Sequence, residues 1–384
     1  MGLMTTRITD EIKSQETVLV RLEANSNIGH GHLARCLSIT RKLIDRFDVV
    51  FLMRECNELI EKKVYQSGAK ICYLATSKKV EFKSSNYNTW LGALINDDAE
   101  EVVGYIVDNS LDKPHIITDC YGIDTDWLGI CRPYCSTVMC VDDLMNRFLD
   151  CDILVDPTFK RGELEYRNLV PDRTILLCGS QYMPLPESLA NRLEKPLKKQ
   201  DGVNILVSFG ATDPNDFSIK LMRYLKTEDL PVNHSFKILL TSDYKKSTEL
   251  FNLVRNLQAN NRPVQVTIDT KDIAMEYAWA DICIGAAGQS IYERIFSKLH
   301  SIVVKTEENQ TANYTRLSEN PFVHLFPEHY EFSRIFDFLR HVIIKKETLQ
   351  VENDVAETDF DLHGADRIAE VFIKGAKGAA FQAR

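Results

Sequence analysis

The 384-residue sequence lacks any apolar run approaching the roughly 20 residues that a membrane-spanning helix requires. Its first sixteen residues, MGLMTTRITDEIKSQE, also lack the apolar core that signal peptides carry. Neither a membrane span nor secretion is indicated by these features. We therefore expect a cytoplasmic protein with no membrane partner.

Basic residues are not in excess. Lys and Arg together number 46 against 55 Asp and Glu, which gives a formal net charge of -9. Proteins that bind nucleic acid usually present a basic face, so the composition argues against a nucleic-acid partner. An anionic ligand would have to be held by a few local groups.

The ten cysteines include no C-x-x-C pair. Such pairs are typical of zinc sites and redox centres, so the cysteines are predicted to be buried free thiols. No internal repeat or low-complexity tract is present. A hydrophobic fraction of 44% over this length is sufficient for two sizeable cores.

Short β-branched runs alternate with amphipathic segments along most of the chain. They are TVLVRL, DVVFLM, AKICYL, HIITD, TVMCVDD and CDILVDP in the first half, and VNILVSFG, FKILLT, VQVTI, DICIGAA and SIVVK in the second. This alternation is typical of parallel sheets covered by helices on both faces. We predict an α/β protein of two doubly wound, Rossmann-like domains facing each other across a cleft.

Domain boundaries are suggested by a stretch between the two sets of runs, where prolines and a cluster of lysines occur. We predict a first domain over residues 17–185, a linker over 186–202 and a second domain over 203–375. The periodic segment LHGADRIAEVFIK predicts a C-terminal helix. This helix could pack on either domain, and we include it in the second.

The stretch SNIGHGHLARC, residues 26–36, follows the first predicted strand and opens a predicted helix. Ligands of open α/β sheets bind where strand ends meet helix N-termini. Gly29 and Gly31 would let the backbone approach a ligand closely. His32 lies in the first helical turn, where the positive end of the helix disfavours protonation of imidazole, and Arg35 lies near the same face. His32 is therefore a candidate base for activating water.

Three other interpretations of this stretch stay open. A metal site would use both His30 and His32, but no carboxylate or cysteine partner is nearby. A dinucleotide fingerprint would need glycine where Ala34 stands and an acidic residue after the second strand, where Glu55 is the best available. The segment could also be a helix-capping loop with an incidental histidine.

Two strand-to-helix turns in the second half suit a phosphate. In SFGATDP, Ser208 and Gly210 precede Asp213, which could equally serve only to begin the next helix. In GAAGQSIYE, a diphosphate could lie on the helix that begins near Ser290. Glu293 would then be placed to accept hydrogen bonds from ribose hydroxyls, although a surface glutamate beside a tightly packed turn is the alternative.

Acidic residues also follow two strands of the first half. Asp119 and Tyr121 come after HIIT, and Asp143 comes after TVMCV, so all three are expected to point into the same cleft as His32. The D-x-D sequences at 124–126 and 150–152 resemble metal-diphosphate motifs. Their places at a helix start and before a strand favour capping instead.

Taken in order over residues 17–345, several motifs resemble the PseG family of UDP-2,4-diacetamido-2,4,6-trideoxy-β-L-altropyranose hydrolases of pseudaminic acid biosynthesis. They are RLEANSNIGHGHLARC, ITDCYGIDTDWL, VDDLMNRFLDCDILVDPTFKR, YRNLVP, LVSFGATDP, IGAAGQSIYERI and EENQ. The resemblance implies the two-domain GT-B fold, similar to that of MurG. The chain departs from the family at Glu23, where aspartate is usual, and at Cys120, where histidine is usual. Both positions are expected to line the sugar pocket, and they leave the identity of the sugar open.

The resemblance implies that His32 is the catalytic residue, that water attacks the anomeric carbon with inversion, and that UDP leaves without help from a metal or another cofactor. The pyrophosphate would lie near Ser290 and the ribose near Glu293. The implied substrate-binding residues are Asn25, Gly29, Gly31, Arg35, Asp119, Tyr121, Asp143, Ser208, Gly210, Ala287, Gly288, Gln289, Ser290, Glu293, Asn309 and Gln310. We expect a monomer whose partners are a UDP-linked diacetamido-trideoxyhexose and the product UDP.

Two other functions fit the same pattern. A GT-B glycosyltransferase would pass a UDP-linked amino sugar to an acceptor, and fold alone does not separate it from a hydrolase. The other is a module that binds a nucleotide sugar without turnover. In such a module, replacement of His32 would leave the ligand affinity and the absence of turnover unchanged.

Overall fold

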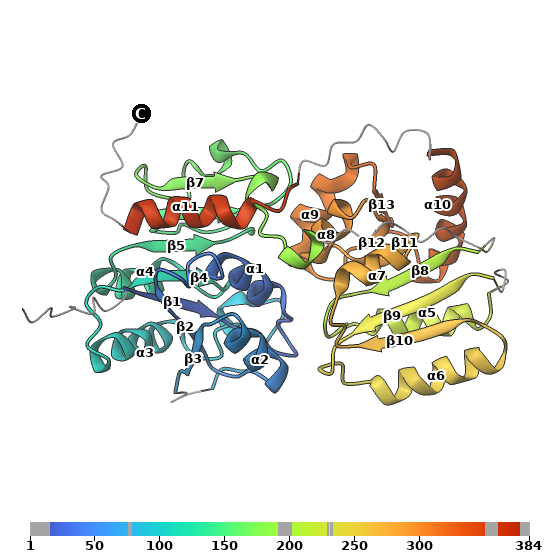
Figure 1. The fold of residues 1–384 in the computed structure, drawn as a ribbon, viewed down its shortest axis with the longest axis horizontal. Helices are drawn as coiled ribbons and strands as arrows, with labels where there is room; N and C mark the ends of the chain where they lie inside the picture. The colour runs from blue at the N-terminus through green and yellow to red at the C-terminus, as the bar shows by residue number, and fades with distance from the viewer. Residues whose placement is uncertain are drawn as a thin grey trace, which may run out of the picture.

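A computed structural model describes residues 16–75, 79–190, 202–228, 230, 233–349 and 360–376. They form two α/β domains that lie side by side (Figure 1). None of the helices in these described ranges is long and apolar enough to cross a membrane. The prediction of two doubly wound domains is confirmed.

The first domain is built on a parallel sheet. Within the described residues it has seven strands in the order β3-β2-β1-β4-β5-β6-β7. Their bounds are β1 Thr17–Leu22, β2 Asp48–Met53, β3 Lys70–Tyr73, β4 His115–Asp119, β5 Val138–Val141, β6 Ile153–Asp156 and β7 Ile175–Cys178. The chain reverses its direction of travel across the sheet between β1 and β4, which pair directly. The loops after these two strands therefore flank the crevice in which such sheets bind ligands.

The second domain repeats this design with six strands among the described residues, in the order β10-β9-β8-β11-β12-β13. Their bounds are β8 Asn204–Ser208, β9 Ser235–Leu240, β10 Val264–Ile268, β11 Ile282–Ala286, β12 His300–Val304 and β13 Val323–Leu325. The reversal falls between β8 and β11. It brings together the two turns that the sequence indicated as phosphate sites.

Helices cover both faces of each sheet. Those of the first domain are α1 Gly31–Thr40, α2 Glu58–Gln66, α3 Ile95–Asp108, α4 Thr125–Cys131 and α11 Gly364–Ala376; those of the second are α5 Phe217–Leu225, α6 Ser247–Ala259, α7 Ile273–Trp279, α8 Ser290–Phe296, α9 Thr311–Arg316 and α10 Ile335–Leu349. The central strands are buried on both faces, as their continuous apolar sequences require.

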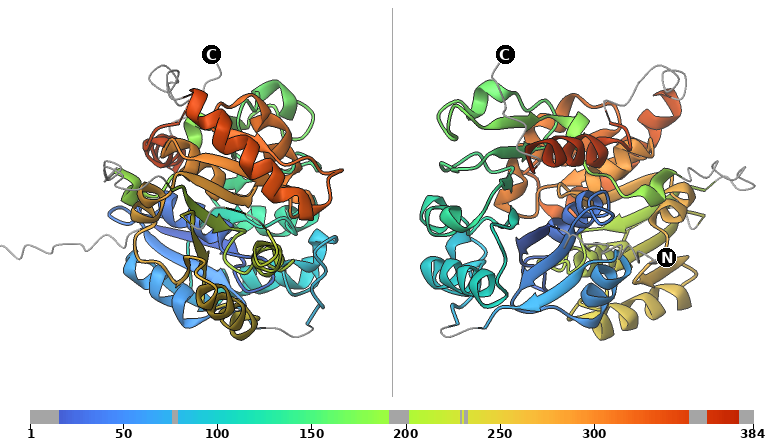
Figure 2. Two further views of the ribbon diagram at one scale, coloured as in Figure 1. Left: turned by 90° about the vertical axis from the view of Figure 1, so that its right-hand side faces the viewer. Right: turned by 60° about the vertical axis from the view of Figure 1, so that its left-hand side comes forward.

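The C-terminal helix α11 belongs to the first domain, which corrects its assignment to the second. It lies against α1 (Figures 1 and 2). Its apolar side contributes Ile368, Ala369 and Phe372 to the core beneath β1 and β2, and all three side chains are buried. Of the linker predicted at 186–202, the structure describes a short turn at Glu187–Ala190, and residues 191–201 lie outside the described part.

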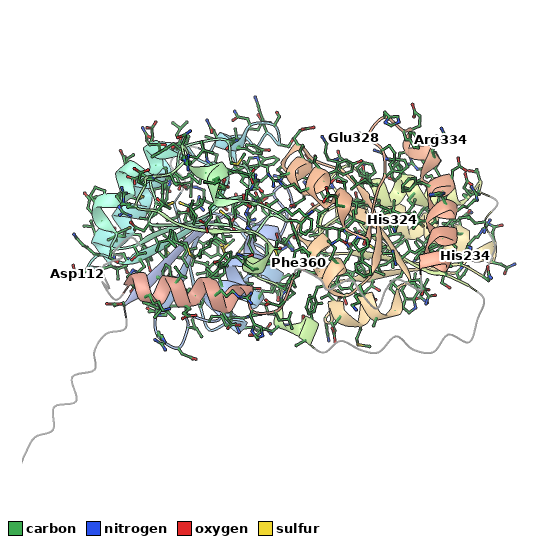
Figure 3. The ribbon with its side chains drawn as sticks, turned by 90° about the horizontal axis from the view of Figure 1, so that it is seen from above. Asp112, His234, His324, Glu328, Arg334 and Phe360 are labelled. Atoms are coloured by element: carbon green, nitrogen blue, oxygen red, sulfur yellow. The ribbon has the colours of Figure 1, made fainter. Side chains whose placement is uncertain are left out.

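The two domains contact each other directly. The backbone N–H of Phe159 donates to the Tyr292 hydroxyl at 3.2 Å, and Arg316 donates to the Lys160 carbonyl at 2.8 Å. Phe360 stacks on Phe159 with ring centroids 5.9 Å apart, and Figure 3 places Phe360 near the junction. These contacts fix how the two switch-point crevices face each other.

Candidate active site

His32 and Asp119 form a hydrogen-bonded pair at the switch point of the first sheet. His32 is contributed by the first turn of α1, as the sequence predicts, and Asp119 ends β4. The His32 Nδ1 atom lies 2.6 Å from Asp119 Oδ1. Asp119 is fully buried and His32 is 7% exposed. Because an ionised carboxylate only accepts hydrogen bonds, Nδ1 is the donor in this pair.

Arg35 holds Asp119 in its ionised form. Its Nε and Nη2 atoms donate to the two oxygens of Asp119 at 2.5 and 2.6 Å, and its Nη1 atom donates to Asp143 at 2.8 Å. Burial alone would raise the pKa of Asp119, but Arg35 and His32 lower it to about 2. The carboxylate is therefore ionised near neutral pH, and its hydrogen bond fixes the ring of His32.

Tyr121 completes this network from the loop after β4. Its hydroxyl donates to Asp143 Oδ1 at 2.7 Å, and its ring meets the His32 ring edge-on at 4.7 Å. Burial, with Asp143 as the next contribution, raises the pKa of Tyr121, so the phenol keeps its proton. His32 is thus held from one side by a carboxylate and from another by an aromatic ring.

A cavity of about 760 Å³ lies between the domains and is lined by residues of both. Thirteen of the seventeen residues predicted as catalytic or substrate-binding line it. They are Gly29, Gly31, His32, Arg35, Tyr121, Asp143, Gly210, Gly288, Gln289, Ser290, Glu293, Asn309 and Gln310. Asn25, Asp119, Ser208 and Ala287 stand outside the lining. The His32 loop and both phosphate-type turns therefore share one space.

Asn25 stands outside the cavity lining but shapes a loop that contributes to this lining. The Asn25 side chain accepts hydrogen bonds from the backbone of Asn27 and Ile28, which closes a tight turn. Gly29 in the same turn has φ +85°, a conformation that favours glycine. The sequence-based expectation placed Asn25 against substrate, whereas its observed hydrogen bonds are to its own loop.

On the opposite wall, Gln310 orders the turn between β11 and α8. Its Oε1 atom accepts from the backbone N–H groups of Ala287 at 3.2 Å and Thr306 at 3.1 Å. One turn into α8, the carboxylate of Glu293 accepts from the Tyr277 hydroxyl at 2.9 Å. Burial raises the pKa of Glu293, while the Tyr277 hydrogen bond opposes that rise. Glu293 is therefore an oriented hydrogen-bond acceptor in the wall.

In the turn after β8, Gly210 lines the cavity with φ +96°. Ser208 lies at the end of the strand, behind this turn. Asp213 accepts hydrogen bonds from the backbone of Phe217 and Ser218 at 2.9 and 2.7 Å. Of the two roles considered for Asp213, the structure shows that of beginning α5.

Two expectations about neighbouring positions are corrected. Glu23 and Cys120 are both buried and neither lines the cavity. Glu23 accepts from the Arg21 guanidinium at 2.6 Å and from the backbone of Arg54 at 3.1 Å, while Cys120 packs in the core. Neither departure from the family pattern therefore reaches the lining of the cavity.

The acidic D-x-D sequences have structural partners. Asp124 caps α4 by accepting from the backbone of Asp126 and Trp127. Asp152 pairs with Arg132 through two hydrogen bonds of 2.5 Å. In the ranges that the structure describes, no three His, Cys, Asp or Glu side chains are grouped as a metal site would need.

An aromatic wall beside His32 was not found from the sequence. It consists of Phe82, Tyr87 and Trp90, from the irregular segment between β3 and α3, and all three line the cavity. Trp90 packs edge-on to His32, with centroids 6.1 Å apart, and lies 5.2 Å from Tyr121. The segment has no periodicity, so the sequence carried only its aromatic content as a signal.

A polar contact across the cavity was also missed. Asp243, after β9, accepts hydrogen bonds from His30 Nε2 at 2.8 Å and from the Asn57 side chain. Burial, followed by the nearby charge of Lys63, lowers the pKa of His30, so the neutral ring is the donor. Of the two histidines in the opening motif, His30 thus contacts the second domain while His32 faces Asp119.

Comparison with known proteins finds distant relatives, and no protein-family model matches the chain. An uncharacterized protein of Methanocaldococcus jannaschii is 22% identical over 307 residues, which cover 77% of this chain and 57% of that protein. The UDP-2,4-diacetamido-2,4,6-trideoxy-β-L-altropyranose hydrolase of Campylobacter jejuni is 20% identical over 307 residues, 79% of this chain and 97% of the hydrolase.

Solved structures match over nearly the whole chain. Acinetobacter baumannii MurG superposes with a TM-score of 0.60 at 13% identity, covering 93% of this chain and 99% of MurG. Anabaena HepE in complex with UDP-glucose superposes with a TM-score of 0.55 at 15% identity, covering 94% and 100%. Two parallel-sheet α/β domains that match these proteins show the GT-B fold.

Proposed function

We propose that the protein hydrolyses a UDP-linked 2,4-diacetamido-2,4,6-trideoxyhexose to UDP and the free sugar, with inversion at the anomeric carbon. The observation that carries this proposal is the His32–Asp119 pair in the wall of an interdomain cavity. The Campylobacter jejuni hydrolase, which aligns with almost its full length, supports the choice of substrate. The GT-B structures that match this chain support the broader class, an enzyme that acts on UDP-sugars.

His32 would act as the general base. Its Nε2 atom accepts a proton from water as the water oxygen forms a bond to C1. The bond between C1 and the phosphate oxygen breaks, and UDP departs with that oxygen. Asp119 holds the ring and stabilises the imidazolium that forms, because its carboxylate is already ionised and hydrogen-bonded to Nδ1.

UDP would lie against the second domain. Its ribose hydroxyls would donate to Glu293, which Tyr277 orients. Its pyrophosphate would approach the backbone at Gly288 and Ser290, where a glycine leaves room, since a Cβ built at Gly288 meets only the Gln310 amide at 4.0 Å. Arg35 has both of its carboxylate partners within the protein, so its part is to position Asp119 and Asp143.

The test is a time-resolved NMR assay with UDP-2,4-diacetamido-2,4,6-trideoxy-β-L-altrose in ¹⁸O-labelled water, without acceptor or added metal. We expect UDP and the inverted free anomer to appear before mutarotation, with the label in the sugar. His32→Gln should abolish turnover and keep UDP binding. Label in UDP, retention of configuration, or no turnover would each contradict the proposal.

A glycosyltransferase is the second candidate, favoured by the neighbours MurG and HepE. The His32–Asp119 pair could deprotonate an acceptor hydroxyl instead of water. Addition of acceptor sugars to the assay separates the two. A transferase would form a new glycoside and release free sugar only slowly.

A further inference from the structure

The cavity between the domains has an acidic lining, although the proposed substrate carries a negatively charged diphosphate. Within the described residues, seven aspartates and glutamates line the cavity, against one arginine and two lysines. Such a lining repels a diphosphate unless a cationic group lies beside it. The partners of the three cationic side chains therefore bear on where the diphosphate can bind.

Two of these three side chains already have carboxylate partners. Arg35 is 3% exposed and binds two carboxylates, at 2.5 and 2.8 Å. Lys246 pairs with Asp216. The Lys245 side chain is exposed and has no ion pair or hydrogen bond within the described part of the chain. Lys245 is therefore the cationic group of the lining that is free to meet an anionic ligand.

The loop that carries Lys245 joins β9 to α6 and is fixed at two points. Thr241 donates to the Ala211 carbonyl through its backbone N–H at 3.2 Å and through its hydroxyl at 2.9 Å. These hydrogen bonds hold the loop against the turn after β8. Asp243, two residues before Lys245, accepts from His30 Nε2 of the first domain at 2.8 Å. Lys245 is therefore anchored between the turn after β8 and the first domain.

The arrangement of the strands places Lys245 within reach of a ligand on both phosphate-type turns. The turns after β9, β8 and β11 are consecutive along one edge of the second sheet, because these strands are adjacent and parallel. Neighbouring strands are about 4.8 Å apart, and the four-carbon stem of lysine is longer than that spacing. The space over the turn after β8 is open, since a Cβ built at Gly210 meets nothing within 4 Å. The Lys245 ammonium group can therefore meet an anion that lies across Gly210 toward Gly288.

We propose that Lys245 binds the diphosphate of the nucleotide from the loop after β9. The inference rests on the proposed function, in which the cavity binds a UDP-sugar. The backbone at Gly288 and Ser290 would donate hydrogen bonds to one phosphate, and Lys245 would supply the full positive charge that the backbone lacks. Lysine binds phosphate as a point charge, so an exposed and flexible side chain suits this role.

The test compares the binding of UDP and of uridine by NMR titration. The two ligands differ in the diphosphate alone, so the ratio of their Kd values isolates that group. We expect Lys245→Gln to weaken UDP binding by roughly tenfold, because a hydrogen bond between charged groups is lost. The Kd for uridine should not change. Lys245→Arg, which keeps the charge, should preserve most of the wild-type affinity for UDP.

Lys226→Gln is the matched control, because Lys226 is exposed at the end of α5 and lies outside the cavity lining. It changes the net charge by the same amount and should leave both Kd values unchanged. Uridine affinity reports that each variant is folded. An unchanged UDP affinity in Lys245→Gln, an equal loss in Lys226→Gln, or an equal loss for uridine would overturn the inference. Absence of UDP binding by the wild type would instead contradict the proposed function.

Discussion

Replacing Asp119 with asparagine should reduce turnover far more than nucleotide binding. Asp119 accepts hydrogen bonds from His32 Nδ1 at 2.6 Å and from two nitrogens of Arg35. An asparagine offers one acceptor oxygen instead of two, and when that oxygen faces Arg35 its amide turns toward His32 and favours the wrong ring tautomer. General-base catalysis contributes about 100- to 10,000-fold, so we expect kcat to fall within that range while the Kd for UDP stays within a factor of two of wild type, that is, about 0.4 kcal/mol.

The same substitution should also lower stability. The folded pKa of Asp119, about 2, lies below its ordinary value of 3.8. The stabilisation is therefore complete above about pH 4 and is lost as pH falls through 2. At about 1.4 kcal/mol per pKa unit the shift corresponds to about 2 kcal/mol, which Asp119→Asn should remove from the free energy of unfolding at pH 7.

Steady-state release of UDP, calorimetry with UDP and urea denaturation measure the three quantities on the same preparations. Asp112→Asn is the matched control, because Asp112 is exposed at the end of the first domain that faces away from the second (Figure 3). It should leave all three unchanged. If Asp119→Asn turned over at the wild-type rate while His32→Gln was inactive, the argument that Asp119 orients the base would be refuted.

Three further outcomes follow from the same contacts. Tyr277→Phe should weaken UDP binding by roughly tenfold, because it removes a hydrogen bond to a buried carboxylate; calorimetry with an unchanged Kd would count against a role for Glu293. Glu23→Gln should flatten the pH dependence of stability. Burial, which Arg21 only partly offsets, raises the pKa of Glu23 from 4.5 to about 7, so the wild type should lose about 3 kcal/mol in urea denaturation as pH rises between these values, and an equal loss in the variant would contradict this. Phe372→Ala should cost about 3–5 kcal/mol of unfolding free energy through a cavity under α11, whereas a cost below about 1 kcal/mol would mean that the helix is not part of the core.

Most strands could be predicted because each is a short run that contains β-branched residues between turn signals. TVLVRL, DVVFLM and VQVTI match β1, β2 and β10 residue for residue. The edge strands β7 and β13 were missed, since each contains a single β-branched residue and β13 has only three residues. The place of α11 was also missed, because an amphipathic helix shows that it has a partner but not which sheet that partner belongs to.

The site residues that lie at the ends of strands could be predicted from the sequence. His32 follows β1, Asp119 ends β4 and Asp143 follows β5, so topology alone brings them together. Contacts that depend on tertiary packing were not predictable. Nothing local connects Trp90 with His32, or Asp243 with His30, because a loop and a domain interface create these neighbours.

The packing of α11 has a consequence for synthesis on the ribosome. Ile368 and Phe372 complete the core of the first domain, yet they are translated after the whole of the second. Domains generally fold as units in the order in which they leave the ribosome. Here the first domain cannot complete its core until the second domain has been translated. A nascent chain that ends near residue 349 would display an open apolar face beside a finished neighbour, and we expect chaperones to bind it there.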